Sequence, residues 1–231
     1  NGIDYDINDP TKYPLIPHKF SSSNLDGKLQ NKLDLQEELG LDIREDVPMF
    51  GIISRLTDQK GFDLIAEQIE ELLQNDLQLV VLGTGERRYE DMFRYFSFKY
   101  PNKVSANITY NGTLAQKIYA DTDFFLMPSQ FEPCGLSQLM ALRYGSVPIV
   151  RETGGLKDTV IPYNKFTGEG IGFTFSNYDS YDMLQAIYRA LEAYQNKNGF
   201  KDIITQGMSM DYSWASSAQL YRQLFEDILK Q

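Results

Sequence analysis

Cysteine and histidine are almost missing from this chain, which contains one of each in 231 residues, Cys134 and His18. A single cysteine excludes a disulfide within the chain and fits a reducing compartment. His18 lies far from Cys134 in the sequence, so no base that would activate the thiol as a nucleophile is evident. No spacing of histidine, cysteine or carboxylate residues is typical of a metal site, and we expect no metal cofactor.

Long apolar runs and an excess of positive charge are also missing. No apolar run approaches the length that crosses a bilayer. The chain has 22 lysine and arginine residues against 32 aspartate and glutamate residues, a net charge of -10. That balance argues against nucleic acid and anionic membranes as partners. The hydrophobic content of 42% is sufficient for a buried core.

The first residues lack the periodicity of a helix or a strand. Residues 1–27 are rich in aspartate, asparagine, proline and serine, and we expect them to form an extended connector. The chain starts at Asn1 without a methionine or a basic, apolar leader, so we expect it to be part of a larger protein. Residues 28–231 are then predicted to form one domain that ends in helices.

Strand and helix patterns alternate along that domain. Short apolar runs predict strands at 49–54, 77–82, 104–108, 124–127, 147–150 and 172–175. Helical patterns lie at 28–39, 61–73, 86–100, 115–120, 136–144, 155–160, 179–194 and 200–208, and a final helix carries Leu220, Leu224 and Ile228. This alternation predicts a parallel sheet with right-handed crossovers, a doubly wound, Rossmann-like α/β fold.

The stretch that points most directly to chemistry follows the apolar run at 124–127. It reads Pro-Ser-Gln-Phe-Glu-Pro-Cys-Gly-Leu-Ser-Gln over residues 128–138. Glu132 therefore lies between the carboxyl end of a strand and the amino end of a helix, where ligands bind in open α/β sheets. Free backbone N–H groups at a helix start also suit an anionic or hydroxyl-rich ligand.

Two cations follow the first predicted strand. Arg55 and Lys60 are five residues apart in a polar loop. A planar guanidinium and a compact ammonium can neutralise a diphosphate from two directions. The alternative is a pair of solvated surface charges.

A glycine pair follows the second predicted strand. Gly83 and Gly85 begin like a dinucleotide fingerprint, but Arg88 occupies the position of the third glycine, which disfavours an NAD site. We interpret this segment as a strand-to-helix turn in which Gly83 lets a nucleotide base come close.

Two further motifs have structural alternatives. Asp121-Thr122-Asp123 is similar to the Asp-x-Asp metal motif of some glycosyltransferases, but it precedes a strand and so lies at the wrong edge of the sheet for a ligand. Thr153-Gly154-Gly155 opens a short helix. It could be an anion-binding loop or a turn that fits the helix against the sheet.

Residues 129–145 resemble the donor-sugar loop of bacterial glycogen synthases and plant starch synthases, whose pattern is Pro-Ser-x-Phe-Glu-Pro-Cys-Gly-Leu-x-Gln-Leu. Residues 1–4 (Asn-Gly-Ile-Asp), 54–61 (Ser-Arg-Leu-Thr-Asp-Gln-Lys-Gly) and 151–156 (Arg-Glu-Thr-Gly-Gly-Leu), with Asp-Thr-Val at 158–160, match the same family in the same order. The resemblance implies the C-terminal, nucleotide-sugar-binding domain of a two-domain GT-B glycosyltransferase. The acceptor-binding N-terminal domain would lie outside this chain.

The resemblance also implies roles for single residues. Arg55 and Lys60 would hold the donor phosphates, and Glu132 would contact the donor glucose. Tyr110 matches an aromatic that stacks on adenine. The remaining expected donor contacts are the backbone N–H groups of Cys134, Gly135 and Leu136 and the side chain of Ser137.

One position departs from many related enzymes, which carry a second glutamate eight residues after the first. Here that position is Met140. Because methionine has no carboxyl group, a mechanism that uses two carboxylates at positions 132 and 140 is excluded. Trp214 and the final helix are interpreted as packing elements. Part of their apolar surface would be exposed because the family's tail crosses to the other domain.

The function implied is transfer of glucose from ADP-glucose to an α-1,4-glucan with retention of configuration, in the bacterial cytoplasm or, in a plant, the plastid. We expect this chain alone to bind ADP or ADP-glucose but to transfer almost nothing. Two alternatives remain open at this point. One is the donor domain of a UDP-sugar transferase, and the other is a non-catalytic carbohydrate-binding module.

Overall fold

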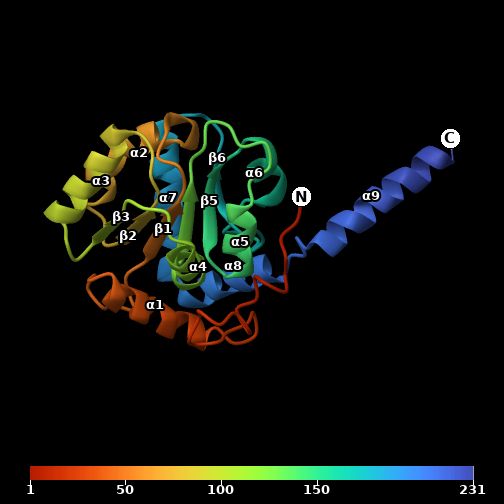
Figure 1. The fold of residues 1–231 in the computed structure, drawn as a ribbon, viewed down its shortest axis with the longest axis horizontal. Coiled ribbons are helices and arrows are strands. Elements are labelled where there is room, and N and C mark those ends of the chain that lie inside the picture. The colour runs from red at the N-terminus through yellow and green to blue at the C-terminus, as the bar shows by residue number, and fades with distance from the viewer. Residues whose placement is uncertain (231) are drawn as a thin grey trace.

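A six-stranded parallel sheet forms the centre of the molecule (Figure 1). The computed structural model describes residues 1–230. The strand order is β3-β2-β1-β4-β5-β6, which confirms the predicted doubly wound α/β fold. The strands are β1 (Met49–Ile53), β2 (Gln78–Leu82), β3 (Val104–Asn107), β4 (Phe124–Met127), β5 (Val147–Arg151) and β6 (Phe173–Phe175).

Helices cover both faces of this sheet. In Figure 1, α7 lies behind the strands, while α4 and α5 lie in front. The helix α2 packs on α3 and α7, and α4 packs on α1 and α5. Their bounds are α1 (Asp26–Glu38), α2 (Phe62–Leu72), α3 (Arg87–Lys99), α4 (Gly112–Asp121), α5 (Ser137–Arg143), α6 (Gly154–Thr159), α7 (Ser180–Gln195), α8 (Lys197–Ser209) and α9 (Trp214–Leu229).

The core is apolar because the sheet is covered on both faces. All five residues of β2 are buried, as expected for a strand of a parallel sheet between two helical layers. Phe124 lies at the centre of an aromatic cluster, with its ring centroid 4.9 Å from that of Phe50 and 5.0 Å from that of Phe200. This rigid core fixes the strand ends from which the loops of the candidate site emerge.

The N-terminal segment contains neither a helix nor a named strand before Asp26. It is nevertheless packed on the domain, since Ile16 and Phe20 are buried in the main core. Ile3 forms a bridge with Ser213, which brings the N-terminal segment next to the start of α9. Between residues 1 and 230, no helix is long and apolar enough to cross a membrane.

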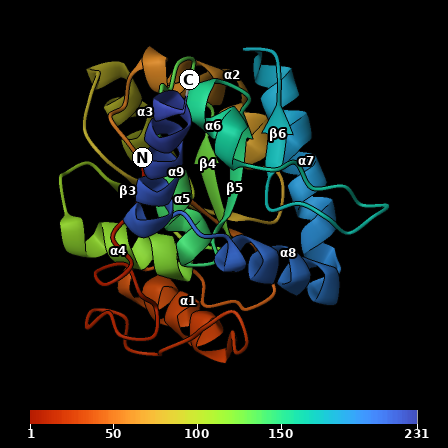
Figure 2. The same ribbon diagram turned by 90° about the vertical axis from the view of Figure 1, so that its right-hand side faces the viewer.

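The final helix leaves the body of the molecule. Figure 1 shows α9 projecting away from the sheet and its helices, and in Figure 2, where that side faces the viewer, α9 lies in front of them. None of its residues is buried, and Trp214 and Leu224 are both about half exposed. The interpretation of Trp214 and this helix as packing elements is wrong for this chain, whereas the exposed apolar surface expected from the resemblance is present.

Candidate functional site

Two adjoining hollows lie at the carboxyl ends of β1, β2 and β4, and both are lined by Ile53 and Ser54. The inner hollow has a volume of about 100 Å³ and the outer hollow about 280 Å³. Eight of the nine residues proposed from the sequence line one of them. The inner hollow has Lys60, Glu132, Gly135, Leu136 and Ser137, and the outer hollow has Arg55, Gly83 and Tyr110.

Lys60 and Glu132 form an ion pair in the inner hollow. Lys60 Nζ lies 2.5 Å from Glu132 Oε2, and the two side chains are 19% and 12% exposed. Lys60 ends a short 3₁₀ helix, η1 (Asp58–Lys60), which the sequence patterns did not predict. Gly61 follows with φ of +79°, and a Cβ there would lie 2.2 Å from the Pro128 carbonyl oxygen. The turn that carries Lys60 therefore packs directly on the loop that carries Glu132.

The loop after β4, residues 128–136, presents backbone donors. The N–H groups of Cys134, Gly135 and Leu136 donate to no backbone oxygen of residues 1–230. The amide of Gln138 fixes this turn, since Nε2 lies 3.1 Å from the Cys134 carbonyl oxygen and 3.0 Å from that of Gly135. Cys134 itself lines neither hollow, and its Sγ lies 2.9 Å from Asn1 Nδ2. Cys134 is therefore the one proposed site residue that the structure does not place in either hollow, and its thiol faces the N-terminal segment.

The outer hollow contains a free cation and a free aromatic ring. The exposed side chain of Arg55 has no hydrogen bond or ion pair within the part of the chain that the structure describes. Tyr110, in the loop between β3 and α4, is 95% exposed. An exposed ring beside an unpaired guanidinium can bind a base and the anionic group attached to it.

Gly83 lines the outer hollow and also allows a close backbone contact. A Cβ at this position would lie 1.8 Å from the Ser54 carbonyl oxygen. The missing side chain makes room for the segment that follows β1. The expectation that Gly83 also lets a base come close stays a prediction.

The glycines after β5 also serve packing. A Cβ on Gly154 would lie 2.2 Å from the Glu132 carbonyl oxygen, and one on Gly155 would lie 2.0 Å from that of Cys134. The Gly155 N–H lies 3.2 Å from the Glu132 carbonyl oxygen and is not free for an anion. Of the two interpretations of Thr153-Gly154-Gly155, the structure favours the packing turn, which supports the loop of Glu132.

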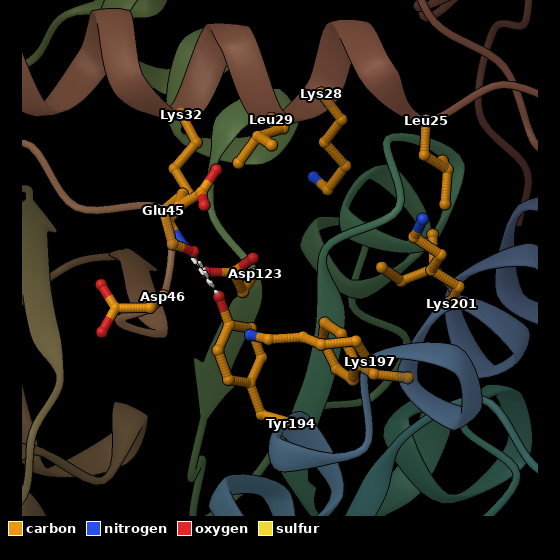
Figure 3. A pocket seen from close by; sticks show the side chains of 12 residues that line it. Leu25, Lys28, Leu29, Lys32, Glu45, Asp46, Asp123, Tyr194, Lys197 and Lys201 are labelled. Carbon is orange, nitrogen blue, oxygen red and sulfur yellow. Dashed lines mark hydrogen bonds and ion pairs between the residues drawn. The ribbon is translucent and has the colours of Figure 1, made fainter.

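A larger cavity of about 330 Å³ lies at the opposite edge of the sheet (Figure 3). Asp123 lies here, 2.7 Å from Lys32 Nζ, and accepts a hydrogen bond from the Met49 N–H at 2.8 Å. The buried Lys28 ammonium donates to three carbonyl oxygens, those of Ala120, Thr122 and Tyr144. Asp123 is thus paired with Lys32, whereas the buried Oδ1 of Asp121 has no hydrogen-bond partner within residues 1–230. The segment lies at the amino ends of the strands, away from the two hollows, as its place before β4 predicted. Residues 1–230 contain no group of three or more carboxylate, histidine or cysteine side chains placed to hold a metal.

Residues 37–205 match the family model described as glycosyl transferases group 1. The chain belongs to this family. The C-terminal domain of a group 1 family protein from Francisella tularensis, LpcC, shares the fold, with a TM-score of 0.63 at 15% identity over 90% of this chain and 95% of that one. The GT-B fold expected from the sequence is confirmed.

Similarity to glycogen and starch synthases is much closer. The chain is 56% identical over 229 residues to the glycogen synthase of Clostridium novyi, covering 99% of this chain and 48% of that protein. The catalytic domain of starch synthase IV from Arabidopsis thaliana, bound to ADP and acarbose, superimposes with a TM-score of 0.90 at 36% identity over all of this chain and 48% of that one. The resemblance drawn from the sequence is confirmed, and the chain spans about half the length of these relatives.

Proposed function

We propose that this chain is the donor-binding half of a retaining glycosyltransferase that transfers glucose from ADP-glucose to the non-reducing end of an α-1,4-glucan. The observation that carries the proposal is the order of groups along the two hollows. Tyr110 offers a face for the base, Arg55 and Lys60 offer charge for the diphosphate, and Glu132 with the backbone donors after it suits the hexose. The likeness to glycogen synthases and to a starch synthase bound to ADP supports the proposed class of donor.

In this proposal the two cations act on the leaving group. Negative charge builds on the distal phosphate as the bond to the sugar breaks, and fixed cations stabilise that charge more in the transition state than in the ground state. Glu132 accepts hydrogen bonds from sugar hydroxyls while it holds Lys60 Nζ at 2.5 Å. Met140 packs against the core at the position where many related enzymes carry a second glutamate, so no carboxylate at that position can act as a covalent nucleophile. This suits a mechanism in which the acceptor attacks on the face that the diphosphate leaves.

The acceptor glucan needs a second domain. The chain spans about half of each curated relative, and α9 carries an apolar face with no partner within residues 1–230. We therefore place an acceptor-binding N-terminal domain next to this one in a longer protein, in the cytoplasm of a bacterium. Residues 1–27 would then be the connector between the two. This chain alone would bind the donor and transfer almost nothing.

Calorimetric titration of this chain tests the proposal. We expect ADP-glucose to bind more tightly than UDP-glucose. Tyr110→Ala should weaken ADP binding by about 1–3 kcal/mol, because a base loses its stacking surface. The exposed Lys165→Ala variant, outside both hollows, should bind as the parent does. Tighter binding of UDP-glucose would favour a UDP-sugar enzyme, and glucan binding without nucleotide binding would favour a carbohydrate-binding module.

A further inference from the structure

The turn that carries Lys60 also contains Asp58, whose carboxylate lies outside both hollows and attaches the turn to α3. Arg88 Nη2 lies 2.6 Å from both Asp58 Oδ1 and Asp58 Oδ2, and the Tyr89 hydroxyl donates to Oδ1. The hydrogen bond from Tyr89 and the charge of Arg88 lower the pKa of Asp58 below its usual value. The carboxylate is therefore ionised at neutral pH, and η1 is fixed to the first turn of α3 by charge-assisted hydrogen bonds.

The same turn has two further attachments. The Tyr178 hydroxyl lies 3.0 Å from the Asp58 carbonyl oxygen, and the Gln130 N–H donates to the Gln59 carbonyl oxygen at 3.0 Å. The second of these joins η1 to the loop of Glu132. Asp58 thus belongs to a turn that contacts both α3 and the loop of Glu132.

Asp58 itself faces neither hollow, whereas Lys60, two residues later, lines the inner one. A lysine side chain has several rotatable bonds, so the position of its ammonium depends on how firmly its backbone is held. Errors of about 1 Å in the position of a group that contacts a reacting ligand can cost a factor on the order of 10². A carboxylate that fixes the backbone of Lys60 can therefore influence the diphosphate without touching it.

We propose that Asp58, held by Arg88 and Tyr89, is a positioning residue for Lys60 and determines how well that lysine meets a nucleoside diphosphate. The proposal rests on the donor-binding function proposed above. Arg88 stands in place of the third glycine of a dinucleotide fingerprint. In this proposal it binds the Asp58 carboxylate on the outer side of the turn. Its pairing with Asp58 is the contact by which α3 supports the site.

A double-mutant cycle with ADP as the probe tests this role. Calorimetry would measure ADP binding to this chain and to its Asp58→Ala, Lys60→Ala and doubly substituted variants. We expect Lys60→Ala to weaken binding by about 10- to 100-fold, as for loss of a charge-assisted hydrogen bond. Asp58→Ala should weaken ADP binding about tenfold when Lys60 is present and less than about twofold when Lys60 is alanine. The second effect is small because Asp58 then has no lysine to position.

Asp76→Ala is the matched control. Asp76 is also an exposed carboxylate held by one arginine, Arg44, at 2.7 and 2.8 Å, but it lies outside both hollows. Its loss should leave ADP binding unchanged. Asp58→Asn, which keeps side-chain volume, and Arg88→Gln, which removes the charge and shortens the side chain, are measured alongside. Both should follow Asp58→Ala, with unfolding midpoints near the parent value.

The outcomes separate this inference from the function on which it rests. A chain that fails to bind ADP contradicts the proposed function. If ADP binds and Lys60→Ala weakens it, the inference fails when Asp58→Ala has no effect, or when its effect is equal in the presence and absence of Lys60. Equal effects would mean that Asp58 stabilises the domain without acting through Lys60.

Discussion

Lys60→Ala is expected to lower the kcat for glucose transfer from ADP-glucose by a factor on the order of 10² to 10³, as for removal of one fixed donor to a developing negative charge. The residue lines the inner hollow beside Glu132, so its loss removes a charge that would face the diphosphate and leaves the carboxylate without its partner. Steady-state kinetics would be measured on a chimera in which this chain replaces the matching residues of the Clostridium novyi glycogen synthase.

Lys165→Ala is the control for this prediction, because Lys165 is an exposed lysine whose partner, Glu192, lies on α7 away from both hollows. It should leave kcat and KM unchanged. Lys60→Arg should retain more activity than Lys60→Ala, since the charge remains although the geometry differs. A Lys60→Ala chimera as active as its parent would show that this cation does not act on the leaving group.

Lys32→Met is expected to lower the free energy of unfolding by about 3–5 kcal/mol, the usual cost of removing one partner of a buried ion pair. The Lys32 side chain is 2% exposed, and its ammonium lies 2.7 Å from Asp123 Oδ2 and 2.9 Å from the Tyr194 hydroxyl oxygen. Figure 3 shows these three side chains meeting at one side of the cavity at the amino ends of the strands. Without the ammonium, the carboxylate would remain at the base of β4 with its charge unmatched. Urea unfolding of this chain measures the change.

Two comparisons make that prediction specific. Lys12 pairs with Asp9 at 3.4 Å, but its side chain is 74% exposed, so Lys12→Met should cost less than about 0.5 kcal/mol. Combining Lys32→Met with Asp123→Leu should recover much of the lost stability, because no buried charge is then left alone. A Lys32→Met variant with an unchanged urea midpoint would mean that the pair contributes nothing to folding.

The sheet was predictable because its signals are local. The runs that became β2 and β4 are apolar and bounded by polar segments, and their alternation with amphipathic stretches specifies parallel pairing. The placing of Glu132 followed from the same logic, since a loop after a parallel strand reaches the carboxyl edge of the sheet.

Contacts between distant segments were not predictable from patterns of this kind. The 3₁₀ turn of Lys60 is attached through Asp58 to Arg88 and Tyr89, which belong to another element. The space at Gly83 is filled by the Ser54 carbonyl oxygen, and the sequence around either residue does not predict that contact. The final helix has an ordinary amphipathic pattern, which does not reveal whether its apolar face is covered by the same chain.

A crystal structure of this chain grown with ADP tests the central claim most directly. The account predicts the adenine on Tyr110 in the outer hollow and the phosphates between Arg55 and Lys60. ADP bound elsewhere, with both hollows open and empty, would contradict the assignment of this edge of the sheet as the donor site.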